Sequence, residues 1–286
     1  MPVEPPVASP RTLAEAYAAL AEQPHRQVAG GTDLLVQITG ELGDPPERVL
    51  DIWHLDELRG IRVESNSLVL GALTTYAELR RSPLIAEFLP AFAEAAATIG
   101  AAQIQNRGTI GGNVMNASPA GDMLPLLLAT DAQLVAGTGN GERWIPVREF
   151  WPAYRRTAIE PTELLLRVSI PLVEGRQLRY RKVGTRRAQA ISKVVMALAW
   201  QATGAPGTTW SNVHLALGSV AATPIRAPAT EAVLEGVAPT EATADRAAST
   251  LASEIEPIDD VRSSADYRRA VAARVLHRLI RDEGGW

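Results

Sequence analysis

The sequence predicts an α+β protein with an N-terminal part of mixed helices and strands and a smaller second domain. Two glycine-paired stretches, residues 28–35 and 106–125, each lie next to apolar runs. Beyond residue 176, three apolar strands follow one another and a group of helices comes after them, an order typical of an α+β domain. A chain of 286 residues is long enough for two domains with separate cores.

The first unit spans about residues 1–57. Its proline-rich start is extended, and residues 12–23 carry alanine and leucine at helical spacing, with Ser9 or Thr12 as a cap. Pro24 ends this helix. The remaining elements are a strand at 26–29, a short helix or strand at 34–38 and a buried strand at 49–52.

The second unit spans residues 58–174. An alanine-rich helix covers residues 84–100 and is interrupted near Pro90. A further helix covers residues 121–128, with Asp122 near its N-terminus. The other elements are a hairpin at 61–70, a helix at 75–81, strands at 131–137, 143–146 and 163–170, and a turn at 146–150.

The character of the chain changes around residues 171–176, so we place the domain boundary there, with domains at 1–174 and 175–286. The second domain has three strands, which we expect to form an antiparallel sheet, and then helices. The last helix carries an apolar stripe on one face. Its elements are strands at 178–183, 192–201 and 212–218 and helices at 231–234, 241–255 and 264–281.

Composition excludes several classes of function. The net charge of −4 gives no reason to expect a nucleic acid or an anionic membrane surface as partner. No run of apolar residues is long enough for a membrane span, and the N-terminus does not resemble a secretory signal, so we expect a cytoplasmic protein.

The sequence contains no cysteine, which excludes disulfides, a cysteine nucleophile and cysteine-ligated clusters in this chain. Its four histidines are far apart and lack the spacing of a zinc site, so we expect no metal ligands and no catalytic side chain. A protein with so few candidate acids, bases and ligands takes its chemistry from an organic cofactor.

The two glycine-paired stretches carry the binding hypothesis. Paired glycines allow positive φ and close approach of a ligand, and the free N–H groups of such turns can hold a phosphate. Neither stretch is a Rossmann fingerprint or a P-loop. One pair alone is usually only a turn, but two suggest a pyrophosphate held from both sides. The first half would be Gly30, Gly31, Thr32, Asp33 and Leu34, and the second Thr109, Ile110, Gly111, Gly112 and Asn113. We expect the Asp33 carboxylate to face away from the phosphate and bond backbone amides of its own loop.

Several motifs together resemble the FAD-binding medium subunit of the molybdenum hydroxylases, the family of xanthine dehydrogenase and aerobic carbon monoxide dehydrogenase. AGGTDLL at 29–35 is similar to the first flavin loop of that family. TIGGN at 109–113, followed by ASPAGD at 117–122, is similar to its second. The resemblance continues through KVGTRRAQAISKV, TPIRA and DYRRAVAARVLHRLI, and so covers nearly the whole chain.

The resemblance implies a fold, a cofactor and partners. The fold is a two-subdomain FAD-binding domain of the vanillyl-alcohol-oxidase/PCMH type, followed by a smaller domain of the carbon monoxide dehydrogenase flavoprotein type with a three-stranded antiparallel sheet and a helical group. The cofactor is FAD without a covalent link. The partners are a small [2Fe–2S] subunit, a large molybdopterin subunit and a diffusible electron acceptor such as NAD, oxygen or quinone, in a dimer of heterotrimers.

The resemblance also assigns individual residues. Asp122 lies near the flavin or its ribityl chain, unless it only serves a helix N-terminus. Lys182 lies close to the flavin ring, unless it is a solvated lysine of an edge strand. Leu165, and less securely Ile99, contact the ring. The complete cofactor-binding set is Ala29, Gly30, Gly31, Thr32, Asp33, Leu34, Ile99, Thr109, Ile110, Gly111, Gly112, Asn113, Asn116, Asp122, Leu165 and Lys182.

Other side chains near these motifs remain open. Met115 is either a contact of the flavin ring or a core residue. Arg186 and Arg187 are either a solvated turn or a loop that attracts an anionic acceptor. Two other functions compete with electron transfer within a complex: a stand-alone FAD oxidase, and a flavin-free structural or assembly subunit. The colour of the purified protein separates the flavin-free alternative from the other two.

Overall fold

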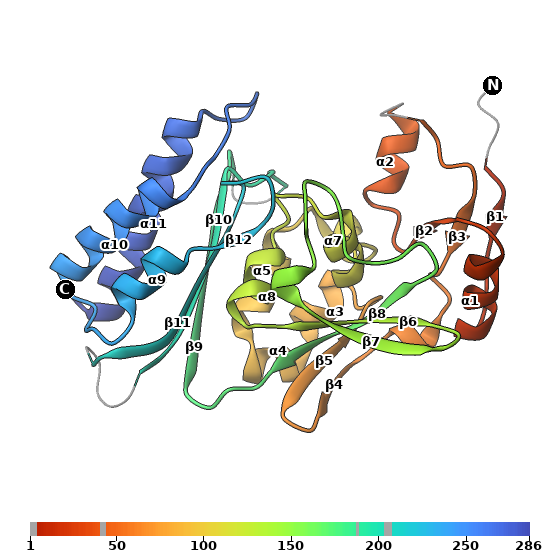
Figure 1. The fold of residues 1–286 in the computed structure, drawn as a ribbon, viewed down its shortest axis with the longest axis horizontal. Coiled ribbons are helices and arrows are strands. Elements are labelled where there is room, and N and C mark those ends of the chain that lie inside the picture. The colour runs from red at the N-terminus through yellow and green to blue at the C-terminus, as the bar shows by residue number, and fades with distance from the viewer. Residues whose placement is uncertain (1–4, 41–43, 187–188, 203–207) are drawn as a thin grey trace.

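The computed structural model describes residues 5–40, 44–186, 189–202 and 208–286. Within these residues three sheets follow one another along the longest axis of the molecule, from the N-terminus to the C-terminus (Figure 1). No helix in the described ranges is long and apolar enough to cross a membrane.

The N-terminal layer is a small parallel sheet in the order β1-β3-β2. Its strands are β1 (Val7–Ala8), β2 (Arg26–Val28) and β3 (Val49–Asp51), and its helices are α1 (Leu13–Glu22) and α2 (Leu34–Thr39). Thr12 caps α1 by accepting a hydrogen bond from the N–H of Glu15. Leu20 and Leu50 pack with Leu164 and Leu166 of β8 (Leu164–Pro171), so this layer shares a core with the next.

The middle layer is a five-stranded antiparallel sheet in the order β4-β5-β8-β6-β7. Its other strands are β4 (Ile61–Glu64), β5 (Ser67–Gly71), β6 (Gln133–Thr138) and β7 (Gly141–Pro146), and 3-10 turns lie at Asp56–Leu58 and Val147–Glu149. The alanine-rich helix is interrupted as expected, because Pro90 begins a second segment. Its segments are α4 (Pro83–Phe88) and α5 (Pro90–Thr98), which follow α3 (Tyr76–Arg81).

The C-terminal layer contains four antiparallel strands, β12-β11-β10-β9, where the sequence predicted three. The added strand, β12 (Ile225–Arg226), is two residues long and carries no periodicity that a sequence pattern could show. The other strands are β9 (Arg176–Val183), β10 (Val194–Ala202) and β11 (Trp210–Gly218), and the helices are α9 (Pro228–Leu234), α10 (Glu241–Glu254) and α11 (Ala265–Gly284).

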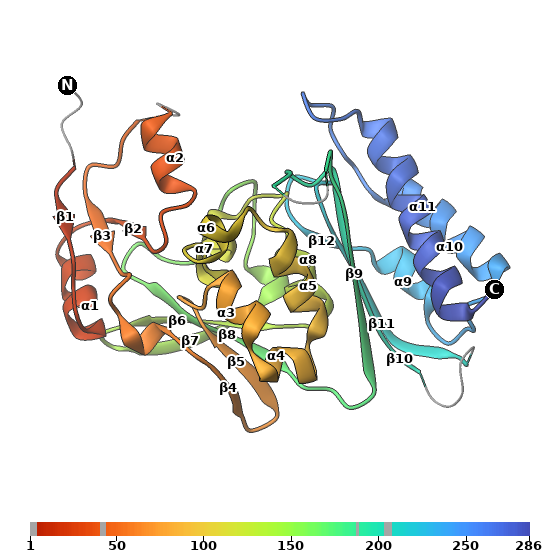
Figure 2. The ribbon, with the colours of Figure 1, turned by 180° about the vertical axis from the view of Figure 1, so that it is seen from behind.

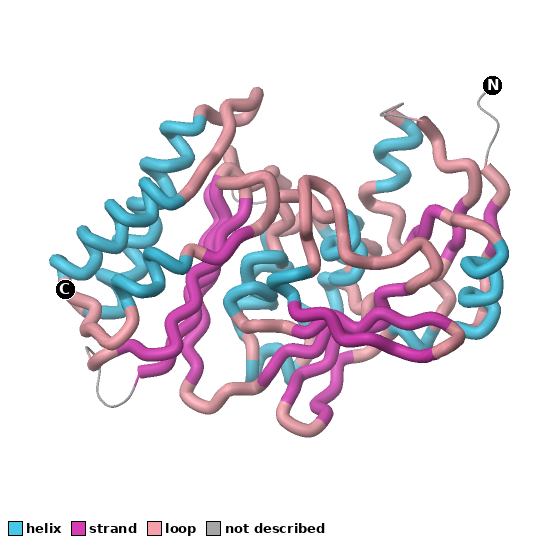
Figure 3. The backbone as a smooth tube through the Cα atoms, in the orientation of Figure 1, coloured by secondary structure: helices cyan, strands magenta, loops and turns pink. Residues whose placement is uncertain are grey.

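Both faces of β10 are buried, and its side chains alternate in size. Met196, Leu198 and Trp200 pack with the α9, α10 and α11 cluster, which lies on the outer face of the sheet (Figure 3). Ala197 and Ala199 pack with the middle layer. The small residues let α5 and α8 (Leu124–Ala129) approach the sheet closely, and Figure 2 shows these helices between the two sheets.

The glycine pair of the second stretch is helical, which corrects the prediction of a glycine turn. The stretch follows α6 (Ala102–Gln105) and contains α7 (Ile110–Asn116), and Gly111 and Gly112 lie inside α7 without positive φ. The next helix, α8, begins at Leu124, so Asp122 precedes its N-cap and is not a helix N-terminal carboxylate. Only Gly31 of the two glycine pairs has a positive φ, of 75°.

His214 of β11 lies against the end of α8 and gives the contact between these elements a pH dependence. Its Nδ1 is 3.1 Å from the carbonyl oxygen of Ala129 and 3.3 Å from Oδ2 of Asp131. Burial lowers the pKa of His214, Arg226 lowers it further, and Asp131 opposes the change. Because the folded pKa lies below the unfolded value of 6.5, protonation favours the unfolded chain.

The stability that neutral His214 provides is therefore complete above the unfolded pKa and is lost as the pH falls from there through the lower pKa of the folded state. We expect the melting temperature to decrease from about pH 7.5 to about pH 5.5, where an ordinary histidine gains its proton. The melting temperature of His214→Gln should decrease less over this range. That of the matched control His54→Gln, at an exposed position, should decrease as in the wild type. Parallel profiles for wild type and His214→Gln would contradict this expectation.

Candidate functional site

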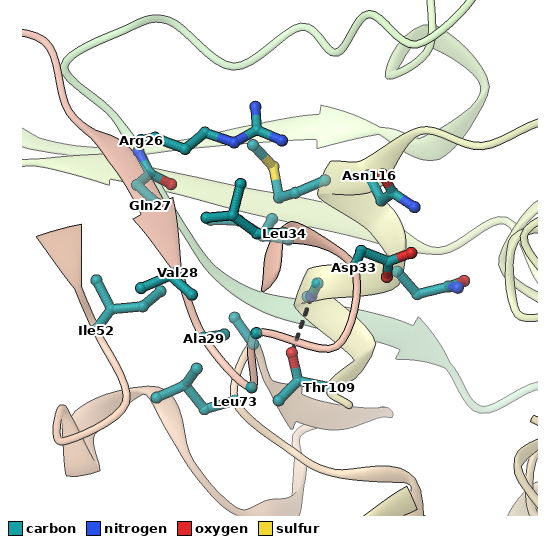
Figure 4. A pocket seen from close by; sticks show the side chains of 18 of the residues that line it. Arg26, Gln27, Val28, Ala29, Asp33, Leu34, Ile52, Leu73, Thr109 and Asn116 are labelled. Atoms are coloured by element: carbon teal, nitrogen blue, oxygen red, sulfur yellow. Dashed lines mark hydrogen bonds between the residues drawn. The ribbon is translucent and has the colours of Figure 1, made fainter. Parts of the chain in front are cut away.

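A cavity of about 280 Å³ lies between the N-terminal and middle layers, and both glycine-paired stretches line it. Figure 4 shows Val28, Ala29 and Leu34 facing Thr109 and Asn116 across this space. The volume is near the lower end of the range for small-molecule sites. The predicted residues that line it are Ala29, Gly30, Gly31, Thr32, Asp33, Leu34, Thr109, Gly111, Gly112, Asn113, Asn116 and Leu165.

The first glycine-paired stretch presents a run of free backbone donors. Gly31 adopts positive φ, and its carbonyl oxygen accepts from the N–H of Leu35 to begin α2. The N–H groups of residues 30–34 make none of the hydrogen bonds found among the described residues. Consecutive free N–H groups in such a turn form a concave anion-binding surface.

The two stretches are in direct contact through Gly30. An alanine Cβ at this position would lie 1.7 Å from the carbonyl oxygen of Arg107 and 3.1 Å from the backbone nitrogen of Gly108. A Cβ on Gly111 would similarly lie 2.5 Å from the carbonyl oxygen of Ala72. The glycines at these two positions are therefore required for close backbone approach, whereas positive φ is required only at Gly31.

The N–H groups of residues 110–113 in the second stretch are hydrogen-bonded within the protein, which corrects the prediction that they are free to hold a phosphate. The N–H groups of Ile110 and Gly111 donate to the carbonyl oxygens of Thr74 and Ala72. The N–H of Gly112 donates to Oγ1 of Thr109 at 3.0 Å, the bond drawn in Figure 4, and the N–H of Asn113 donates to the Thr109 carbonyl. This stretch can therefore offer a ligand in the cavity the Thr109 hydroxyl, the side-chain amide of Asn113 and the space beside Gly112.

Asp33 does not bond the amides of its own loop, contrary to the prediction. It occupies the N-cap position of α2 but makes no side-chain capping bond, and it remains exposed at the rim of the cavity. The surrounding protein removes part of its hydration, which raises the pKa of the Asp33 carboxyl, and the Arg155 cation opposes this rise.

Asp122 and Lys182 do not line the cavity and form a buried ion pair with each other. The Lys182 Nζ is 2.6 Å from Oδ2 of Asp122, and their side chains are 6% and 11% exposed. Lys182 also donates to the carbonyl oxygen of Thr98, and the Ser192 hydroxyl donates to Oδ1 of Asp122. Burial raises the pKa of Asp122, and the Lys182 ammonium and the Ser192 hydroxyl oppose the rise. Lys182 is thus a buried partner of Asp122 and not a solvated lysine.

The remaining candidates are distributed around this centre. Ile110 is fully buried in the core, and Ile99 packs on the same core without lining the cavity. Met115 packs on this core and also lines the cavity. Arg186 donates to the carbonyl oxygen of Gln189, so it is part of a closed turn. Arg187 lies outside the described residues.

Sequence reasoning missed several polar side chains at the cavity, among them His25, Gln27 and Glu160. Arg26 also lines it from β2, as Figure 4 shows, and Tyr76 lines it from the start of α3. Arg155 lies in the segment between β7 and β8, where its Nη1 donates to Oδ1 of Asn116 at 3.1 Å. The sequence did contain one signal, because Arg26 lies two residues before the first glycine-paired stretch. Tyr76 and Arg155 lie outside both stretches, and nothing in their local sequence indicated their position.

Two family descriptions match this chain. "FAD binding domain in molybdopterin dehydrogenase" matches residues 3–173, and "CO dehydrogenase flavoprotein C-terminal domain" matches residues 179–282. The chain is similar to the carbon monoxide dehydrogenase medium chain of Hydrogenophaga pseudoflava, with 33% identity over 95% of this chain and 94% of the relative. It is also similar to the nicotinate dehydrogenase FAD-subunit of Eubacterium barkeri, with 30% identity over 97% of each chain.

Solved structures show the same relationship. Reconstituted CO dehydrogenase from Oligotropha carboxidovorans superposes with a TM-score of 0.93 at 30% identity, covering 100% of this chain and 99% of the other. The structure of carbon monoxide dehydrogenase from Hydrogenophaga pseudoflava superposes with a TM-score of 0.91 over 97% of this chain.

Proposed function

The chain belongs to the FAD-binding medium subunits of the molybdenum hydroxylases, and from this premise we propose that it transfers electrons within such a complex. Electrons would arrive from a small iron–sulfur partner subunit and leave to a diffusible acceptor such as NAD, oxygen or quinone. A large partner subunit would carry molybdopterin and hydroxylate the substrate. The sequence contains no cysteine, the residue whose thiolates hold iron–sulfur clusters, so the clusters belong to a partner in this proposal.

The observation that supports this function best is the donor set of the cavity. The free N–H groups at residues 30–34 and the Arg26 guanidinium suit the pyrophosphate of a dinucleotide. Apolar side chains of Val28, Ile52 and Leu165 suit its flat rings. The buried Oδ1 of Asn113 has no protein partner, so it suits a ligand donor. The residues present therefore fit FAD.

Each part of this chain has a definite task in the proposal. The first glycine-paired stretch binds the pyrophosphate, and Leu34, Met115 and Leu165 exclude water from the rings. FAD supplies the redox chemistry when it is bound. The Lys182 ammonium, held by Asp122, places a fixed positive charge next to the site. The proposed cofactor-binding set remains the sixteen residues given above, with Arg26 added.

Two further parts of the proposal concern organisation. We propose that the domains are 1–174 and 175–286, and the two matched family ranges and the separate core of the C-terminal helices support this division. We also propose a dimer of heterotrimers, and the names of two relatives, which are medium chains, support a complex of several different subunits. The relatives act on different compounds, so the chain does not indicate the hydroxylated substrate.

An absorption spectrum of the purified chain, followed by chromatography of the heat-released supernatant, tests the cofactor. We expect flavin bands and free FAD in the supernatant. Pigment that stays with the precipitated protein would indicate a covalent flavin and a stand-alone oxidase. A colourless chain that takes up no added FAD would indicate a flavin-free structural subunit. Co-purification with a cysteine-rich subunit then tests the electron donor.

Replacing Gly112 with valine should remove FAD and leave the fold intact. A Cβ at this position meets only Oγ1 of Thr109 within 4 Å, at 3.0 Å, and otherwise extends into the cavity. Valine also has a higher helix propensity than glycine, so α7 should still form. We expect FAD affinity to decrease at least about tenfold, the effect of roughly 1.4 kcal/mol of lost binding.

Fluorescence titration with FAD measures this change, and the melting temperature of the apo protein is the control for folding. Gly112→Ala, which adds only the Cβ, should lose less affinity than Gly112→Val. Normal flavin occupancy in Gly112→Val would contradict the assignment of the second stretch to the cofactor site.

A further inference from the structure

One wall of the cavity is formed by residues 159–161, in the segment that joins β7 to β8. Ile159, Glu160 and Pro161 all line the cavity, and Leu165 lines it a few residues further on, from β8. Residues 159–161 belong to no helix or strand, so no regular ladder of backbone hydrogen bonds fixes them. Their position therefore depends on contacts with other segments.

Glu163 is the residue through which this wall is held. Its side chain is 8% exposed, and its Oε2 accepts from the backbone N–H of Glu160 at 2.8 Å. Its own N–H donates to the carbonyl oxygen of Glu160 at 3.0 Å, so residues 160–163 form a closed turn. Its carbonyl oxygen accepts at 2.9 Å from the side-chain amide of Gln27, which lines the cavity from β2 (Figure 4). Glu163 thus connects two cavity-lining segments, one in each of the layers that enclose the cavity.

Arg143 of β7 fixes the same wall from its other end. Its Nε lies 2.6 Å from Oε1 of Glu163 and its Nη2 lies 2.7 Å from Oε2, a bidentate ion pair. Nη2 also donates to the carbonyl oxygen of Ala158 at 2.6 Å, and the N–H of Ala158 donates to the carbonyl oxygen of Phe150. Bidentate pairs of this kind are strong and have a definite geometry. Arg143 therefore holds the residue before the wall and the residue that closes the turn after it.

We propose that Arg143 and Glu163 are positioning residues of the cofactor site, and that their ion pair holds residues 159–161 where bound FAD requires them. Neither residue lines the cavity, so each acts through residues that do. The proposal rests on the proposed function, because it takes the ligand of this cavity to be FAD. Without the pair the wall can move, and FAD must order it on binding, so the cost of that ordering weakens the affinity.

Glu163→Gln is the sharpest variant because it keeps the size of the side chain and removes its charge. We expect the dissociation constant for FAD, measured by fluorescence titration of the apo protein, to increase about five- to tenfold, the effect of one lost hydrogen bond. Arg143→Met, at a side chain that is 44% exposed, should weaken binding to a similar extent without altering the 160–163 turn.

The matched control is Glu142→Gln, which breaks a second bidentate pair on the same strand. Nη1 of Arg167 donates to Oε1 of Glu142 at 2.9 Å and Nη2 donates to Oε2, and neither residue lines the cavity. Loss of this pair leaves the contacts of residues 158–163 intact. We therefore expect Glu142→Gln to bind FAD with the wild-type dissociation constant.

Hydrogen exchange of the backbone amides, measured by mass spectrometry, separates positioning from a general loss of stability. In apo Glu163→Gln the amides of residues 158–163 should exchange faster than in the wild type, and those of the C-terminal sheet should keep their wild-type rates. Saturating FAD should remove most of this difference, because the bound ligand restores the wall. Faster exchange throughout the described chain would instead indicate a purely structural role and overturn the proposal.

A double-mutant cycle tests whether Arg143 and Glu163 act as one unit. Arg143→Met combined with Glu163→Gln should weaken FAD binding little more than either change alone, because both break the same pair. Fully additive losses would overturn the proposal, as would an unchanged dissociation constant for Glu163→Gln and Arg143→Met or an equal loss for Glu142→Gln. A wild-type chain that binds no FAD would overturn the proposed function first, and this inference with it.

Discussion

Apo protein carrying Gly30→Ala is expected to take up no FAD at concentrations that saturate the wild-type chain. The added Cβ would lie 1.7 Å from the Arg107 carbonyl oxygen and 2.4 Å from its carbonyl carbon, both of which are backbone atoms. No side-chain rotation can relieve this overlap, so the two glycine-paired stretches must separate. Separation moves the free N–H groups of residues 30–34 away from Thr109 and Asn113, and the cavity loses its shape.

The same overlap should also reduce stability. Inserting an atom into a packed interior costs about 1–3 kcal/mol, and more when only backbone can move. Chromatography of released flavin measures occupancy, and urea unfolding of the apo protein measures stability. The matched control is Gly139→Ala, where the nearest atom to the new Cβ is 3.9 Å away. Wild-type occupancy in Gly30→Ala would show that the contact between the stretches is dispensable.

Lys182→Met is expected to destabilise the fold strongly. It leaves the Asp122 carboxylate buried, with the Ser192 hydroxyl as its remaining side-chain partner among the described residues. Removing one member of a buried ion pair typically costs about 3–5 kcal/mol, because the remaining charge is uncompensated. The pair also joins three segments, since Lys182 lies on β9, Asp122 precedes α8, and the Thr98 carbonyl that Lys182 contacts ends α5.

A second substitution distinguishes lost charge compensation from lost packing. Asp122→Asn in the Lys182→Met background removes the unpaired charge, so we expect it to restore at least about half of the lost free energy of unfolding. Lys193→Met is the control, because the Lys193 ammonium interacts among the described groups with the Tyr267 ring, at 5.0 Å, and such contacts contribute about 0.5–1 kcal/mol. A loss below about 1 kcal/mol for Lys182→Met would mean that the pair contributes little.

The first glycine-paired stretch shows how far local sequence predicts a site. Its glycines, its position after a strand and its glycine turn could be anticipated, because each depends on the backbone preferences of neighbouring residues. The second stretch shows the limit. Gly111 and Gly112 have low helix propensity, yet they lie in α7, because Thr109 caps that helix and Gly111 fits against the Ala72 backbone. Tertiary contact outweighed local preference there.

By itself the sequence determined the periodic elements, the two glycine-paired stretches and the absence of cysteine ligands, since composition and short-range spacing carry that information. Only the tertiary structure decided which N–H groups remain free and which glycines allow close backbone approach, and it paired Asp122 with Lys182 across 60 residues. The physical reason is that burial and hydrogen bonding depend on which distant segments pack together. No local pattern records those partners.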